Sequence, residues 1–148
     1  MKILIGVDDT PSARAALDYV RSQAWPSGTR ALLVSSHQPD SIVYTESYSE
    51  PRETMDEVFD HDADSTRHLV SDLAHELRDQ GLETETRVVT GDPREAIVDA
   101  AKDDHVDLIV LGSRDRSGMS RLFHGSVASH VVAHAPCNVL VVKLPTAA

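Results

Sequence analysis

Residues 3–11 read ILIGVDDTP, and this stretch decides the fold. Residues 3–7 form a short apolar run without alternating polar side chains, which is typical of a strand buried on both faces of a parallel sheet. Asp8 ends the run, and Asp9 or Thr10 can cap a helix that carries Pro11 in its first turn. The stretch therefore predicts a buried strand that passes through a turn into a helix.

The same pattern recurs along the chain. Apolar residues at helical spacing predict four helices. One begins at Pro11, one ends at Gly81, one begins at Pro93 and one begins near Gly125. The polar segment 35–50 is predicted to be a loop. Further strands are predicted at residues 31–34, 83–89, 106–111 and 138–142, with 83–89 at an edge of the sheet. Strands that alternate with helices predict an α/β fold, with one open parallel sheet covered on both faces.

Length and composition favour one globular domain over residues 1–148. Hydrophobic residues make up 41% of the chain and charged residues 26%. Cys137 is the only cysteine, which excludes an internal disulfide and fits a reducing, cytoplasmic location. The apolar run at the amino terminus is too short for a signal peptide, and no stretch approaches the roughly 20 apolar residues of a membrane span.

The charge is unevenly distributed. The chain has 24 acidic and 14 basic residues, a net charge of −10, which argues against binding to nucleic acid or to an anionic membrane. Residues 40–79 hold 12 acidic residues and 3 basic ones. Residues 108–126, by contrast, carry Arg114, Arg116 and Arg121 beside the single acid Asp115, so this segment could meet a small anion.

Two loops are candidates for a ligand site, because ligands of open parallel sheets bind beyond the carboxyl ends of the strands. One loop follows residues 3–7 and offers Asp8 and Asp9. The other follows residues 106–111 and combines glycines, arginines and Ser126 at a helix start, which are the ingredients of a phosphate site. The same residues are also compatible with a tight turn followed by an N-cap serine.

Three segments carry a family resemblance. Gly112-Ser113-Arg114, Gly125-Ser126-Val127 and residues 134–142 (HAPCNVLVV) resemble the C-terminal signature of the universal stress protein family. Residues 3–8, 91–93 and 107–112 also fall where that family places its motifs. The resemblance spans the whole chain.

The resemblance implies a five-stranded, Rossmann-like parallel sheet with strand order 3-2-1-4-5, a homodimer formed through the last strand, and a role in stress survival. Many family members bind ATP, so ATP, with or without Mg²⁺, is the implied cofactor. Asp8 and the backbone of Val7 and Val34 would meet the adenine, and Gly112 the ribose. The residues implied for the phosphate side are Arg114, Gly125, Ser126 and Val127.

One position departs from the family's nucleotide-binding pattern. The pattern has a glycine three residues after its first glycine, and here Asp115 stands there. A carboxylate at that point adds bulk and like charge near a phosphate, unless it turns outward toward Arg114 or Arg116 or faces a divalent metal. The alternative is therefore a universal stress protein that binds no nucleotide and acts through dimerisation and protein partners.

Enzyme motifs are missing from the sequence. The Walker pattern GxxxxGK[ST] and the nucleophile elbow GxSxG are both absent. We therefore expect no catalytic residues, with slow ATP hydrolysis as the remaining enzymatic hypothesis.

The histidines and the cysteine are expected to be structural or solvated. His130 and His134 have the spacing of two metal ligands, but no HExxH pattern accompanies them, so they read as a surface pair. His61, His68 and His75 recur every seven residues, about 10 Å apart on a helix and too distant for one ion. Cys137 is expected to be a small core residue.

Overall fold

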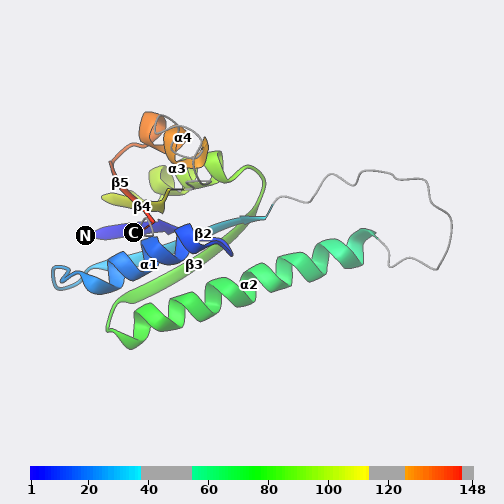
Figure 1. Ribbon diagram of the computed structural model, residues 1–148, viewed down its shortest axis with the longest axis horizontal. Helices are drawn as coiled ribbons and strands as arrows, with labels where there is room; N and C mark the ends of the chain where they lie inside the picture. The colour runs from blue at the N-terminus through cyan, green and yellow to red at the C-terminus, as the bar shows by residue number, and fades with distance from the viewer. Residues whose placement is uncertain (38–54, 114–125, 145–148) are drawn as a thin grey trace.

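The computed structural model describes residues 1–37, 55–113 and 126–144, and of these it leaves out the side chains of residues 55–62 and 126. Strands and helices alternate along the chain, as the sequence predicts (Figure 1). The strands are β1 (Lys2–Gly6), β2 (Arg30–His37), β3 (Glu83–Thr90), β4 (Leu108–Gly112) and β5 (Asn138–Val142). The helices are α1 (Pro11–Ser22), α2 (Met55–Asp79), α3 (Pro93–Asp103) and α4 (Ser126–His134).

The strands form one parallel sheet in the order β3-β2-β1-β4-β5. β1 lies in the centre, where Ile3 is paired with Ala31 of β2 and with Leu108 of β4. The chain moves outward in one direction from β1 to β3 and in the other from β4 to β5, so the order reverses at β1. This switch point is where doubly wound sheets bind ligands. The predicted fold class and the edge position of β3 are both confirmed.

Helices cover both faces of the sheet (Figure 1). Ile3 and Ile5 of β1 belong to the core layer that α1 and α2 cover, whereas Leu4 belongs to the layer under α3 and α4. All three side chains are fully buried. Burial on both faces explains why the strand reads as an unbroken apolar run.

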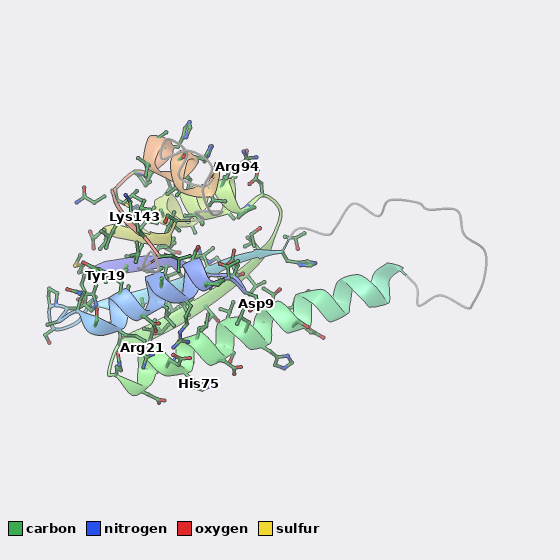
Figure 2. All side chains as sticks on the ribbon, in the orientation of Figure 1. Asp9, Tyr19, Arg21, His75, Arg94 and Lys143 are labelled. Atoms are coloured by element: carbon green, nitrogen blue, oxygen red, sulfur yellow. The ribbon has the colours of Figure 1, made fainter. Side chains whose placement is uncertain are left out.

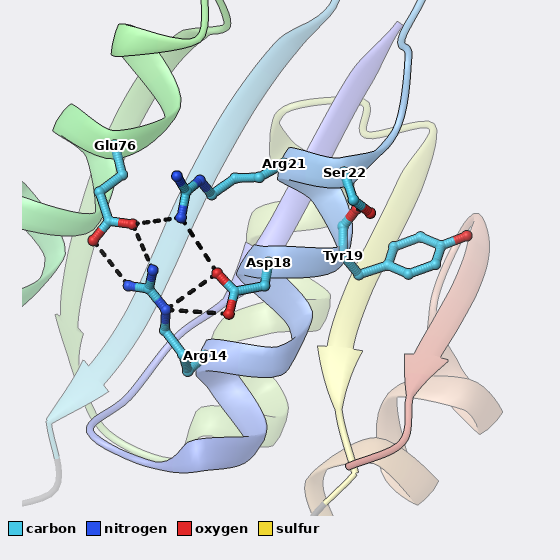
Figure 3. A network of polar contacts seen from close by, with 6 residues as sticks. All are labelled: Arg14, Asp18, Tyr19, Arg21, Ser22 and Glu76. Atoms are coloured by element: carbon cyan, nitrogen blue, oxygen red, sulfur yellow. Dashed lines mark hydrogen bonds and ion pairs between the residues drawn. The ribbon is translucent and has the colours of Figure 1, made fainter. Parts of the chain in front are cut away.

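An ion-pair network joins the two helices that share one face (Figure 3). Arg14 of α1 donates two hydrogen bonds of 2.8 Å to the carboxylate of Glu76 on α2. Arg21 donates a further bond of 3.0 Å to Glu76, and Asp18 lies between the two arginines. The hydrogen bonds from Arg14 hold the pKa of Glu76 below its ordinary value and raise the pKa of Arg14.

Local signals set the helix ends. The hydroxyl of Thr10 accepts from the Ala13 N–H at 3.2 Å, so Thr10, and not Asp9, caps α1. Gly81 ends α2 with a φ of 87°, a left-handed conformation that glycine adopts without strain, as the sequence predicts. Asp92 caps α3 by accepting from the Arg94 N–H at 2.9 Å.

Two predicted boundaries are wrong. The loop is predicted to begin at residue 35, but Ser35, Ser36 and His37 continue β2 in register with β3. The rest of that predicted loop, residues 38–50, lies outside the described residues. The fourth strand begins at Leu108 and not at Val106, because the Val106 N–H bonds back to Ala101 at the end of α3. Backbone hydrogen bonds thus keep the polar residues Ser35 to His37 in a strand, and they keep the apolar residue Val106 out of one.

Among the described residues, no helix combines the length and apolar character needed to cross a membrane.

Candidate functional site

A cavity of about 250 Å³ lies at the carboxyl ends of the central strands. Its floor comes from β1, β2 and β4 and the segments that follow them, and its walls come from the starts of α1, α3 and α4. The residues that line it are Gly6, Val7, Asp8, Thr10, Ser12, Ala13, Val34, Ser36, Pro93, Ile97, Leu111, Gly112, Val127 and Ala128. Its volume is close to the lower end of the roughly 300–1,000 Å³ of small-molecule pockets.

The cavity brings together five of the residues that the sequence nominates. Val7, Asp8, Val34, Gly112 and Val127 come from four different elements or the turns beside them, and all five line it. This convergence follows from the parallel order, because the carboxyl ends of β1, β2 and β4 meet at one edge of the sheet.

The remaining nominated residues belong to the phosphate side. Arg114 and Gly125 lie outside the described residues, as does Asp115. Ser126 is the first residue of α4, and its side chain is not among those described.

Asp8 supplies the charge of the cavity. It is the one Asp, Glu, His, Lys or Arg among the described residues that line it. The Thr10 hydroxyl donates to the Asp8 carboxylate and accepts from the Ala13 N–H, so the start of α1 orients the carboxylate. Asp9, its neighbour, is exposed and is not among the lining residues (Figure 2).

The backbone of Val7 and Val34 is partly committed to the fold. The Val7 N–H donates to the Val34 carbonyl at 2.9 Å, which extends the β1–β2 contact beyond the strand itself. Both backbones are predicted to meet an adenine base. The Val7 N–H already has a partner in the fold, so it is not available as a donor to that base.

Gly112 is required by a close approach of backbone to backbone. A Cβ at this position would lie 2.0 Å from the carbonyl oxygen of Ser12, at the start of α1. The Ser12 hydroxyl donates to the Ser113 carbonyl at 2.8 Å and fixes the two segments together. The glycine that the resemblance assigns to ribose contact thus has a packing role in this chain as well.

Sequence reasoning missed part of the lining. Thr10, Ser12, Pro93 and Ile97 line the cavity, and so does Ser36. Ser36 follows Val34 by two residues, so it shares a face of β2, and its hydroxyl donates to the Gly91 carbonyl. Extending the second predicted strand by three residues would have found it.

A second hollow, of about 480 Å³, lies near the ends of α1 and α2 and the turn around Gly28. It is larger than the first, but it is away from the carboxyl ends of the strands and contains none of the nominated residues. We therefore place the candidate site in the smaller cavity.

Cys137 and two of the histidines occupy the places expected of them. Cys137 is half-buried against the core under α3 and α4, and burial raises the pKa of its thiol, which keeps it protonated. His68 and His75 are exposed, and Figure 2 shows His75 on the side of α2 away from the sheet. The side chain of His61 lies outside the described part. Across residues 1–37, 63–113 and 127–144, no three His, Cys, Asp or Glu side chains gather as a metal site.

The fold and the cavity define an open, doubly wound α/β domain with a ligand crevice at its switch point. Residues 1–143 match the universal stress protein family, and the chain belongs to that family.

Individual relatives cover nearly the whole chain. The universal stress protein in the QAH/OAS sulfhydrylase 3′ region of Thermus aquaticus is 32% identical over 141 residues, which is 95% of this chain and 97% of the relative. The solved structure of protein MJ0577, from Methanocaldococcus jannaschii, is 26% identical with a TM-score of 0.82 and covers 99% of this chain and 97% of its own.

A third comparison extends the fold to a plant protein that was solved with AMP bound. This universal stress protein of Arabidopsis thaliana, At3g01520, is 20% identical with a TM-score of 0.72, over 99% of this chain and 93% of its own. At that identity the similarity shows the fold alone.

Proposed function

We propose that this chain binds an adenine nucleotide, ATP with or without Mg²⁺, and that occupancy of the site is a regulatory signal in stress survival with little or no turnover. The observation that carries the proposal is the convergence of Val7, Asp8, Val34, Gly112 and Val127 on one cavity at the switch point of the sheet.

The chemistry of the cavity suits a base. Val34 and Ile97 supply apolar walls for a flat ring, and the Asp8 carboxylate can accept from an adenine amino group. Val127 and Ala128, in the first turn of α4, also line the cavity, so the amino terminus of that helix lies beside it. The positive end of a helix dipole favours a phosphate. At3g01520, which has this fold, was solved with AMP.

The proposal of little turnover rests on the kind of groups that line the cavity. Hydrolysis needs a positioned base and a cationic clamp on the phosphates. In the described lining, Asp8 is the single candidate base, and its carboxylate already accepts from Thr10.

Isothermal titration with ATP and Mg²⁺ tests the binding. We expect one nucleotide per chain, and we expect Asp8→Ala to weaken binding by about ten-fold or more, since a hydrogen bond to a charged group contributes roughly 1.5–3 kcal/mol. Asp9→Ala is the matched control, because it removes the same charge one residue away and outside the cavity. No heat from the natural chain at millimolar nucleotide would contradict the proposal.

A second candidate function follows from Asp115, which stands where the family pattern has a glycine. In that case the chain binds no nucleotide and acts through dimerisation and protein partners. Asp115→Gly separates the two functions. Binding that appears only in the variant supports the second candidate, whereas an unchanged affinity supports the first.

We also propose that the chain forms a homodimer through β5 in the cytoplasm. β5 is last in the strand order, and its residues Val139–Val142 are only partly buried. An edge of this kind can pair with a second copy, and a charge placed on it opposes pairing. We expect a dimer in light scattering and a monomer for Val141→Lys. A monomeric natural chain at high micromolar concentration would rule out this assembly.

A further inference from the structure

Three hydroxyl groups line the cavity of the candidate site, on Thr10, Ser12 and Ser36. In the described part of the lining, these are the side chains with a hydrogen to donate, because the others are apolar, glycine or the carboxylate of Asp8. A hydroxyl group has one hydrogen, so each of the three can donate one hydrogen bond. The partners of these three hydrogens therefore decide what the lining can offer to a ligand.

The hydrogens of the two serines are committed to the backbone. Ser12 donates to the Ser113 carbonyl at 2.8 Å, and this hydrogen bond is buried. Ser36 donates to the Gly91 carbonyl in a part-buried position. Turning either hydroxyl toward a ligand would take this donor away from a carbonyl that is shielded from water, which costs free energy.

The Thr10 hydrogen and one backbone hydrogen are committed as well. Thr10 donates to the Asp8 carboxylate, and its oxygen accepts from the Ala13 N–H at 3.2 Å. The Val7 N–H donates to the Val34 carbonyl at 2.9 Å. The side chains of the described lining therefore present acceptors to a ligand, namely carboxylate oxygens and the lone pairs of hydroxyl oxygens.

We propose that the acceptors of Asp8 and Ser36 select a nucleotide whose base carries an amino group over one with a carbonyl oxygen at the same position. This inference rests on the proposed nucleotide function and adds a base specificity to it. Adenine and hypoxanthine are the matched pair, because the same purine ring carries an amino group in the first and an oxygen in the second. An amino group brings its own hydrogens to the acceptors of the lining.

A carbonyl oxygen on the base is rejected because it needs a donor. Beside Asp8 it would face a carboxylate oxygen with no hydrogen between the two atoms, and their negative charges would repel. The ring nitrogen next to this oxygen carries a hydrogen in hypoxanthine, but the oxygen itself would still lack a partner. The hydroxyl hydrogens of Thr10, Ser12 and Ser36 are committed elsewhere and are not available to it.

Isothermal titration of the full chain with ATP and with ITP, each with Mg²⁺, tests the proposal. ITP has hypoxanthine in place of adenine, and its ribose and phosphates are those of ATP. We expect the natural chain to bind ITP at least about ten-fold more weakly than ATP. Equal affinities would overturn the base specificity and leave the proposed nucleotide function intact. Binding of neither nucleotide would contradict both.

Asp8→Asn replaces the carboxylate by an amide, which has a donor as well as an acceptor. The amide oxygen can still accept from Thr10, and denaturant unfolding checks that the variant folds. We expect ATP to bind more weakly and ITP more tightly, so that the preference for ATP falls at least about ten-fold. Asp9→Asn is the matched control, because Asp9 is exposed and outside the lining, and its preference should equal that of the natural chain. An unchanged preference in Asp8→Asn would overturn the proposal.

Ser36→Ala tests whether the serine hydrogen is committed to the backbone. If the hydroxyl donates to the Gly91 carbonyl alone, its removal takes no donor from a ligand, and the preference for ATP over ITP stays the same. If the hydroxyl turns toward ITP in the natural chain, the variant binds ITP more weakly and the preference for ATP rises. A rise would therefore overturn the proposal.

Discussion

Gly112→Ala is predicted to destabilise the protein by about 2–3 kcal/mol, the upper part of the roughly 1–3 kcal/mol that overpacking costs in a core. The cause is the contact between the end of β4 and the start of α1. The added Cβ would lie 2.0 Å from the Ser12 carbonyl oxygen, 2.3 Å from its carbonyl carbon and 2.9 Å from its Cα.

The magnitude follows from what would have to move. Ordinary contacts between heavy atoms need about 3.5 Å, so the Ser12 carbonyl would have to withdraw by roughly 1.5 Å. The clashing atoms are backbone, so no rotamer change relieves them. One hydrogen bond resists the displacement of α1 from the end of β4, namely the bond from the Ser12 hydroxyl to the Ser113 carbonyl at 2.8 Å.

Denaturant unfolding of the natural chain, Gly112→Ala and Gly6→Ala measures the effect. Gly6 is the matched control, because its added Cβ would meet the Leu111 side chain at 2.5 Å, and a side chain can rotate away. We expect Gly6→Ala to lose about 1 kcal/mol, the lower end of the same range. If Gly112→Ala unfolds within about 0.5 kcal/mol of the natural chain, an effect no larger than that of an ordinary surface substitution, the packing explanation of this glycine is wrong.

Three further predictions concern the rest of the fold. His105, which follows α3, has a φ of 51°, a left-handed conformation that favours glycine. His105→Gly should therefore raise the free energy of unfolding by about 1 kcal/mol, and a lower midpoint of denaturant unfolding would contradict this. Arg87 forms an ion pair of 2.6 Å with Asp104 and lowers the pKa of that carboxyl in the folded chain. The contribution of this ion pair to the free energy of unfolding is therefore complete at neutral pH and is lost as the pH falls below about 5, and Asp104→Asn should reduce that pH dependence. Glu76→Gln weakens the network with Arg14 on an exposed surface and should cost less than about 1 kcal/mol in thermal unfolding; a larger loss would show that the network, and not the core, holds α2 in place.

The fold could be predicted because its strands are buried on both faces. β1 and β4 read as unbroken apolar runs, and each is fully buried along its central residues. Turn and cap residues then set the ends, as Gly81 does after α2 and Pro93 does at the start of α3. Periodicity and local turn chemistry suffice for this class of fold.

Less of the site could be predicted, because it depends on contacts between segments distant in sequence. Ser36 reads as loop by its polarity, yet it is held in β2 by pairing with Val89 of β3. Thr10 and Asp9 are equal candidates for the cap by residue type, and only the backbone geometry of α1 selects Thr10. The approach of Gly112 to Ser12 joins residues 100 positions apart, so no local pattern reports it.

Gly112 and Asp8 have a role in the fold as well as a predicted role in nucleotide binding, so their presence cannot separate the two candidate functions. Gly112 accommodates the Ser12 backbone, and Asp8 accepts from the hydroxyl that caps α1, so both residues serve the folded chain without any ligand. A universal stress protein that bound no nucleotide would still need them, and their presence therefore favours neither function. Asp115 is different, because it departs from the nucleotide-binding pattern at a point where phosphate and carboxylate would repel. Asp115→Gly is accordingly the substitution that tells the two functions apart, whereas Asp8→Ala shows where a nucleotide binds once binding is observed.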